Sequence, residues 1–138
     1  MKIDETPAAL HLGRIRLLRN RAAYYREMHD FYLEQVEKLS PYRRDGTFKK
    51  ELQRMAVESE KQAEAIEAQA GELIREIEAV PDVRERQLLF LRFVDGLSWT
   101  DASRSMGLSS GWFYTLRKRA LTKFEEQYLQ VSAEEGGG

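Results

Sequence analysis

The stretch that decides the fold is residues 80–124, VPDVRERQLLFLRFVDGLSWTDASRSMGLSSGWFYTLRKRALTKF. Its pattern predicts three helices separated by two short turns. Gly107 can end a helix in a left-handed conformation at little steric cost, and Ser109 can cap the helix that follows. That last helix has no acidic residue before Glu125, and it carries Arg117, Lys118, Arg119 and Lys123. A short helix, a glycine turn and a basic second helix predict a helix-turn-helix that places side chains in a DNA major groove.

The composition of the chain predicts an all-α protein. Leu, Ala, Glu, Arg and Gln dominate, and runs of Val, Ile and Thr at strand spacing are absent. The 138 residues contain no cysteine, which excludes disulfides and thiolate metal sites. No apolar run approaches the roughly 20 residues that span a bilayer, and the N-terminus lacks the features of a signal peptide. We therefore expect a soluble, cytoplasmic protein with no membrane partner.

Ahead of this stretch the sequence predicts two long amphipathic helices. Residues 1–9 indicate a flexible N-terminus, with Thr6 and Pro7 at a suitable helix start. A first helix over residues 8–39 has apolar positions with heptad spacing at Ile15, Leu18, Ala22, Tyr25, His29, Tyr32, Val36 and Leu39. Leu17, Tyr24, Met28 and Phe31 widen this apolar face, which predicts that the helix contacts more than one neighbour.

Residues 40–47 predict a break, because they contain proline, Asp-Gly and a potential cap at Thr47. The second helix is expected over residues 48–79. Its seam alternates steps of four and three residues, as expected of a helix face that packs against a neighbour. The seam consists of Leu52, Ala56, Ser59, Ala63, Ile66, Ala70, Leu73, Ile77 and Val80.

The charges on these two helices are of opposite sign, although the whole chain has a net charge of only −1. The first helix carries several arginines before its first acid, Glu27, whereas the outer face of the second helix is rich in glutamate. Opposite signs on two seamed helices predict an antiparallel hairpin or coiled coil over residues 10–80. Pairing within one chain and pairing between identical chains fit this pattern equally well. A homodimer formed through residues 10–80 is therefore a second expectation.

Residues 81–130 are expected to form a three-helix domain. Pro81 and Asp82 open its first helix, Gly96 ends it, and Ser98 caps the second helix. Residues 131–138, which end in Glu-Glu-Gly-Gly-Gly, are expected to be a disordered tail. The spacing of apolar side chains predicts buried positions at Leu88, Leu89, Leu91, Phe93, Val94, Ala102, Ser103, Met106, Phe113, Leu116, Ala120, Leu121 and Phe124.

The buried face of the last helix determines which of its residues are exposed. We expect a recognition helix over residues 109–124. One set of side chains would face the bases: Ser109, Ser110, Gly111, Tyr114, Thr115 and Lys118. A second set would contact phosphates, which gives affinity without sequence information: Ser98, Thr100, Arg104, Arg117, Arg119 and Lys123.

Other residues indicate packing rather than chemistry. Trp99 and Trp112 are expected to lie in the core or at its rim rather than to stack on bases. His29 lies on the predicted seam, and with His11 as the only other histidine the sequence predicts no metal site. The sequence contains no nucleophile–base pattern and no phosphate-binding glycine loop. No enzyme activity and no cofactor are therefore expected.

Residues 82–124 resemble region four of sigma factors. The matching segments are Arg84-Glu85-Arg86, Met106-Gly107-Leu108-Ser109 and Arg119-Ala120-Leu121-Thr122-Lys123. The whole chain is similar to RinA/ArpU-like phage transcriptional regulators, in which a long charged helical half precedes a sigma-like module. Ser98-Trp99 and Phe113-Tyr114 fit that pattern. The resemblance implies a small activator of phage or mobile-element genes that binds promoter DNA at the nucleoid of a bacterial host.

These features together predict a sequence-specific DNA-binding transcriptional regulator. Its partner would be double-stranded DNA, and the helical half would dimerise it or dock it on RNA polymerase. The alternative is a protein-binding adaptor or anti-regulator that acts on the transcription machinery without binding DNA. The aromatic side chains of Trp112 and Tyr114 would suit that alternative, because both are expected near the exposed end of the last helix.

Overall fold

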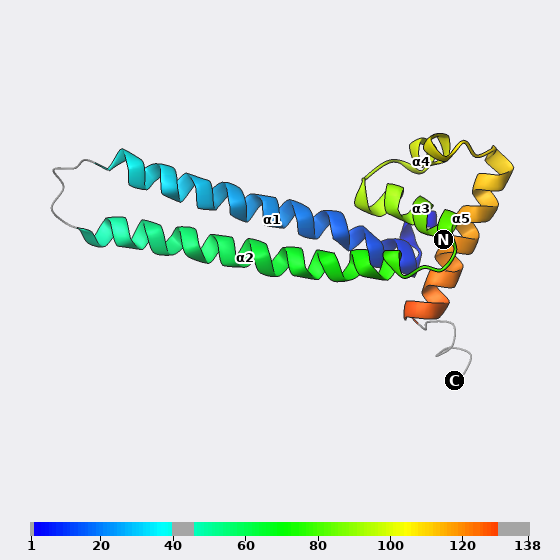
Figure 1. The fold of residues 1–138 in the computed structure, drawn as a ribbon, viewed down its shortest axis with the longest axis horizontal. Coiled ribbons are helices and arrows are strands. Elements are labelled where there is room, and N and C mark those ends of the chain that lie inside the picture. The colour runs from blue at the N-terminus through cyan, green and yellow to red at the C-terminus, as the bar shows by residue number, and fades with distance from the viewer. Residues whose placement is uncertain (1, 40–45, 130–138) are drawn as a thin grey trace. The chain divides into compact units, whose positions relative to one another are not determined.

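A computed structural model describes residues 2–39 and 46–129 of the chain (Figure 1). Every regular element in these ranges is helical, which confirms the predicted all-α class. The elements, in chain order, are a 3-10 turn at Ile3–Glu5, α1 at Pro7–Lys38, α2 at Gly46–Glu78, α3 at Val83–Leu89, a π-helical turn at Phe90–Val94, α4 at Trp99–Met106, α5 at Ser110–Phe124 and a second π-helical turn at Glu125–Leu129. The predicted tail at residues 131–138 lies outside the described residues, as does most of the predicted break at residues 40–47.

The chain divides into two compact units. The helical-pair unit is Leu17–Ala70, and the composite unit joins Met1–Arg16 to Gly71–Gly138. These boundaries differ from the domain boundaries that the sequence predicts after residues 9 and 80. The difference arises because Leu12 and Ile15 of α1, and Leu73 and Ile77 of α2, are buried within the composite unit.

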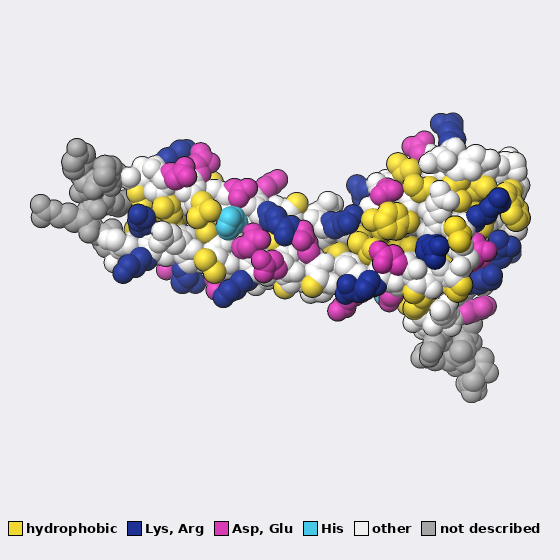
Figure 2. Space-filling view, viewed as in Figure 1, with side chains coloured by type: hydrophobic (Ala, Val, Ile, Leu, Met, Phe, Trp, Pro, Cys, Tyr) yellow, Lys and Arg dark blue, Asp and Glu magenta, His cyan; other side chains and the backbone are white. Residues whose placement is uncertain are grey.

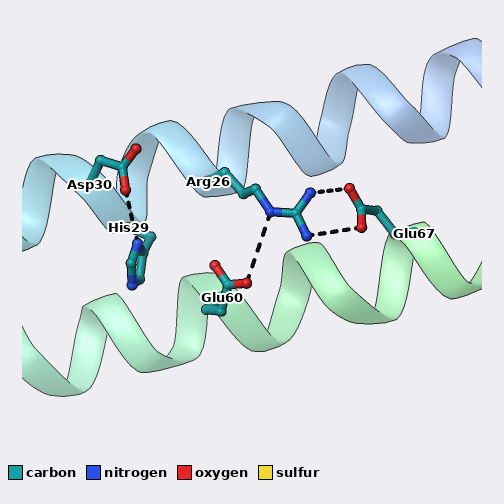
Figure 3. A network of polar contacts seen from close by, with 5 residues as sticks. All are labelled: Arg26, His29, Asp30, Glu60 and Glu67. Atoms are coloured by element: carbon teal, nitrogen blue, oxygen red, sulfur yellow. Dashed lines mark hydrogen bonds and ion pairs between the residues drawn. The ribbon is translucent and has the colours of Figure 1, made fainter.

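The core of the helical-pair unit consists mainly of small side chains. Its α1 and α2 segments lie side by side and run in opposite directions (Figure 3). On α2 every predicted seam position of this unit is buried, which confirms the seam: Leu52, Ala56, Ser59, Ala63, Ile66 and Ala70. On α1 only Leu18 and Ala22 are buried, whereas the seam positions from Tyr25 onward are half-buried. The predicted cap Thr47 lies inside α2, which begins one residue earlier at Gly46.

Ion pairs connect the two helices of this unit. The guanidinium group of Arg26 donates hydrogen bonds to both carboxylate oxygens of Glu67, and its Nε atom lies 3.9 Å from Oε1 of Glu60 (Figure 3). This partnership lowers the pKa of Glu67 below its ordinary value. His29 contacts its neighbour Asp30 instead, at 3.1 Å between Nδ1 and Oδ1. Figure 2 shows acidic and basic side chains interspersed along the visible face of the long helices.

The composite unit has a core of larger side chains. Leu88, Leu89, Leu116 and Phe124 are almost completely buried there. Trp99 is also buried, and its ring meets that of Phe93 edge to face at 5.6 Å between centroids, which confirms the expected packing role of Trp99. Helix ends in this unit follow local sequence signals. Asp82 caps α3 by accepting hydrogen bonds from the N–H groups of Arg84 and Glu85, and those bonds lower the pKa of Asp82.

The first nine residues of the chain are part of the composite unit. A 3-10 turn precedes Thr6, whose hydroxyl accepts a hydrogen bond from the N–H group of Ala9 at 3.3 Å. Ala8 and Ala9 are buried. Where the sequence predicts a flexible N-terminus over residues 1–9, the structure has the 3-10 turn and the beginning of α1, and Asp4 bonds to α4 and to the turn before it, as described below. No helix among the described residues is both long and apolar enough to cross a membrane.

Candidate nucleic-acid interface

The turn between α4 and α5 has the predicted backbone geometry. Gly107 is left-handed at φ 68° and ψ 31°, and its N–H group donates to the carbonyl group of Arg104 at 3.0 Å. The N–H group of Leu108 donates to the carbonyl group of Ser103 at 3.1 Å, so two otherwise unpaired carbonyl groups at the end of α4 are satisfied. The two predicted caps are also confirmed, because Ser98 Oγ accepts from the Asp101 N–H group and Ser109 Oγ accepts from the Trp112 N–H group.

The outward face of α5 carries the residues that were predicted to face the bases. All six are exposed: Ser109, Ser110, Gly111, Tyr114, Thr115 and Lys118. The hydroxyl group of Thr115 donates to the carbonyl group of Gly111 at 3.2 Å. A shallow groove runs along this face, and Tyr114, Thr115, Lys118 and Lys123 are among the residues that line it.

Four of the six predicted phosphate contacts are solvent-exposed. Thr100 and Lys123 are exposed, and Arg104 lies 3.9 Å from Asp101 one turn before it. Ser98 is exposed but its hydroxyl oxygen is engaged as the cap of α4. The hydroxyl group of Ser98 can therefore offer a phosphate only its hydrogen, because its oxygen already accepts the capping bond.

Arg117 does not lie free on the surface. Its guanidinium group packs over aromatic rings, at 5.1 Å from the centroid of Phe113, 5.7 Å from Trp99 and 5.8 Å from Tyr114. Its Nε atom is buried, and no hydrogen-bond partner for it is present among the described residues. A cation held against aromatic faces in this way is stabilised by the ring quadrupoles. Arg117 therefore links α4 to α5, and its reach toward a phosphate is restricted.

Arg119 is engaged by a buried carboxylate on α3. Its Nε atom lies 2.9 Å from Oε1 of Glu85, and Nζ of Lys123 lies 3.4 Å from the same oxygen. Glu85 is only 1% exposed. The sequence of α5 alone does not reveal this acid, because Glu85 belongs to α3. The spacing within α3 does indicate that Glu85 is buried, since Glu85 lies three residues before Leu88 and therefore on the same face of the helix.

A second carboxylate approaches the start of α4. Oδ1 of Asp4 accepts a hydrogen bond from the indole N–H group of Trp99 at 3.0 Å and another from Arg92 at 3.3 Å. The bond from Trp99, with smaller contributions from Arg92 and Arg117, lowers the pKa of Asp4 below its ordinary value. The guanidinium group of Arg92 also donates to the carbonyl group of Leu97 and packs over the ring of Trp99. These contacts hold the N-terminal segment against the beginning of α4.

Two aromatic side chains are exposed at the first turns of α5. Trp112 is 39% exposed and Tyr114 is 59% exposed. The guanidinium group of Arg119 lies 5.7 Å from the ring of Trp112, so this tryptophan lies at the rim, as the sequence predicts. The exposed end of α5 thus combines small, aromatic and basic side chains.

Among the described residues, no cluster of histidine and acidic side chains could hold a metal ion. No family model, curated protein or solved structure was found to match this chain.

Proposed function

We propose that this protein is a sequence-specific DNA-binding transcriptional regulator whose helix α5 reads the major groove. The observation that carries this proposal is the outward face of α5. Gly111, Tyr114, Thr115 and Lys118 are exposed there, and no acidic residue is present in that helix, which ends at Phe124. A helix that follows a left-handed glycine turn and presents such a face is the part of a helix-turn-helix that contacts base edges.

The side chains on this face are suited to direct readout. Ser110 and Gly111 are small, so the backbone at the start of α5 can approach base edges closely. The Tyr114 hydroxyl can donate or accept a hydrogen bond, and the Thr115 methyl group can pack against a thymine methyl group. Lys118 can donate to the acceptor atoms of guanine, and no hydrogen bond or ion pair within the described residues engages its ammonium group.

Affinity for the phosphate backbone of DNA would come from fewer cationic side chains than α5 contains. Arg119 is bound to Glu85, and Arg117 packs on aromatic rings, so the exposed side chains of Arg104 and Lys123 are the better candidates for phosphate contacts. Lys123 would exchange its contact with Glu85, at 3.4 Å, for the phosphate. Each phosphate contact that is lost flattens the dependence of log affinity on log salt concentration by about one unit. We therefore expect a shallow salt dependence for one copy of the protein.

The resemblance to phage regulators indicates which genes this protein would regulate. We infer from it an activator of phage or mobile-element genes. Residues 10–80 would then mediate homodimerisation or contact with RNA polymerase. A dimer would double the number of base contacts, which compensates for the short reading face of a single α5.

One observation favours a second function. Trp112 and Tyr114 expose aromatic surface at one end of α5, and exposed aromatic side chains are enriched where proteins bind each other. A protein-binding adaptor or anti-regulator could use this surface without binding DNA. The two functions are distinguished by whether the purified protein binds duplex DNA.

Selection from a pool of randomised duplex DNA by the purified full-length protein tests the proposal. We expect enrichment of a common sequence, with affinity for that sequence reduced by about 1–3 kcal/mol in Lys118→Ala. The matched control is Lys50→Ala, which removes an exposed lysine from α2 and should leave affinity unchanged. Failure of the wild-type protein to enrich any sequence would refute DNA recognition and leave the adaptor function as the better explanation.

A further inference from the structure

Tyr114 is the largest of the side chains proposed to face the bases. It is 59% exposed and lines the shallow groove along α5. A side chain that rotates freely in the unbound protein loses that freedom on binding, which costs affinity and blurs the choice between base pairs. Whatever restrains the ring of Tyr114 therefore bears on sequence recognition.

The Tyr114 ring is contacted by the guanidinium group of Arg117, about one turn further along α5. The central carbon of that group lies 5.8 Å from the centroid of the ring. Residues three apart on a helix are neighbours on its surface, so the spacing of these two side chains allows the contact. A guanidinium group within about 6 Å of an aromatic ring attracts the face of that ring. Arg117 thus gives the Tyr114 ring a preferred position.

Arg117 can restrain Tyr114 because its own guanidinium group is held by other aromatic rings. It lies 5.1 Å from the ring centroid of Phe113 and 5.7 Å from that of Trp99, and its Nε atom is buried. The ring of Trp99 is buried in turn, and its indole N–H group donates a hydrogen bond to Asp4. A series of contacts therefore runs from the buried start of α4 through Arg117 to the exposed ring of Tyr114.

We propose that Arg117 is a positioning residue for base readout: it holds the Tyr114 ring so that the Tyr114 hydroxyl group meets one base pair, and it makes no phosphate contact of its own. This role rests on the proposed function, because it presupposes that α5 reads DNA. Arginine suits the role, since its planar guanidinium group stacks on aromatic faces and stays charged.

A positioning role and a phosphate contact predict different results when the charge of Arg117 is removed. Loss of a phosphate contact would lower the slope of log affinity against log salt concentration by about one unit, and it would weaken binding to all sequences alike. Loss of positioning should leave that slope unchanged and reduce discrimination at the base pair that Tyr114 reads. Arg117→Met separates the two, because methionine keeps a flexible apolar side chain against the rings.

Selection from randomised duplex DNA, followed by affinity measurements on single-base-pair variants of the selected sequence, tests the proposal. Tyr114→Ala first identifies the base pair that Tyr114 reads. Arg117→Met should reduce discrimination at the same base pair by about fivefold or more, the lower end of what one base pair contributes, with an unchanged salt slope. The matched control is Arg104→Met, which removes an exposed arginine of α4 and should lower the salt slope without changing discrimination.

A double variant separates positioning from a general change in α5. In the Tyr114→Ala background, Arg117→Met should cause no further loss of discrimination, because the side chain that it positions is absent. Discrimination lost at several base pairs would show that Arg117 merely packs the helix. A lower salt slope in Arg117→Met would show a phosphate contact. Either result, or undiminished discrimination in Arg117→Met, would overturn the proposal.

NMR of the free wild-type protein tests the restraint on Tyr114 without DNA, so it remains decisive if Arg117→Met does not fold. We expect nuclear Overhauser contacts between the Tyr114 ring and the side chain of Arg117, and their absence would contradict the restraint. Failure of the wild-type protein to enrich any sequence would refute DNA recognition and the positioning role together. Enrichment by the wild type with a contrary result in Arg117→Met would refute the positioning role alone.

Discussion

The Nε atom of Arg119 on α5 lies 2.9 Å from the buried carboxylate of Glu85 on α3. This contact connects the proposed recognition helix to α3, and Lys123 approaches the same oxygen at 3.4 Å. A carboxylate that is 1% exposed is costly to bury unless it is paired. Arg119 therefore stabilises the fold, and Lys123 is shared between Glu85 and the exposed surface. Fewer cations of α5 remain free for nucleic acid than the sequence indicates.

Replacing Arg119 with alanine should destabilise the protein. The substitution leaves Glu85 buried without its closest donor, which costs about 1–3 kcal/mol. We expect the lower part of that range, because Lys123 remains near the carboxylate. Urea unfolding of Arg119→Ala against Arg84→Ala, an exposed arginine of α3, measures the difference. Equal midpoints for the two variants would contradict a stabilising role for the Glu85 contact.

The same substitution at two glycines should change stability in opposite directions. Gly107→Ala places a Cβ atom at φ 68°, where no neighbour lies within 4 Å, so the cost of about 1–2 kcal/mol is purely conformational. Gly111→Ala lies inside α5 with open space around it and should stabilise the helix by up to about 1 kcal/mol. Thermal unfolding of both variants measures this pair of effects. If Gly111 approaches base edges, Gly111→Ala should also bind the selected duplex more weakly despite its higher stability.

The hydrogen bond between Asp4 and Trp99 should make stability depend on pH. The pKa of Asp4 is lowered from 3.8 in the folded state, so its stabilising contribution is fully present above pH 3.8. The contribution is lost as the pH falls through the lower folded-state pKa. Asp4→Ala should therefore cost about 1 kcal/mol at neutral pH and progressively less in acid. Denaturation curves at a series of pH values check this, and a cost that is independent of pH would show that the carboxylate charge is irrelevant.

The ion pair between the long helices should be visible in a titration. Arg26 lowers the pKa of Glu67 from 4.5, mainly through the hydrogen bonds between them. Arg26→Gln should raise the pKa of Glu67 toward that ordinary value. NMR titration of the Glu67 side-chain carboxyl group in wild type and variant measures the change. Glu51, whose pKa is lowered by Arg54 of the same helix, provides an internal reference that Arg26→Gln should leave unchanged.

Local patterns in the sequence predicted much of this fold. The α2 seam from Leu52 to Val80 was predicted from alternating steps of four and three residues, and all its positions are buried. The caps Ser98 and Ser109 and the left-handed Gly107 depend on side chains within a few residues of each other. Helix periodicity also predicted which residues of α5 would be exposed.

The contacts that local patterns missed connect distant parts of the chain. Asp4 and Trp99 are separated by most of the sequence, and no repeating pattern in the sequence indicates that they are in contact. The sequence predicts a flexible N-terminus because the composition of a segment does not show which distant residues contact it. Arg117 was expected to contact phosphate because its charge is apparent from the sequence, whereas its packing over Phe113 and Trp99 requires three-dimensional proximity.

The composite unit is assembled from the two ends of the chain, with the helical-pair unit inserted between them. During synthesis the ribosome releases Leu17–Ala70 long before Leu121 and Phe124. The inserted helices can therefore pair while translation continues, whereas residues 2–16 make their contacts with segments that are synthesised later. Asp4 meets Trp99 of α4, and the N–H group of Ala8 donates to Glu125 after α5. Synthesis runs from the N-terminus to the C-terminus, but the burial of the N-terminal segment is completed only near the end.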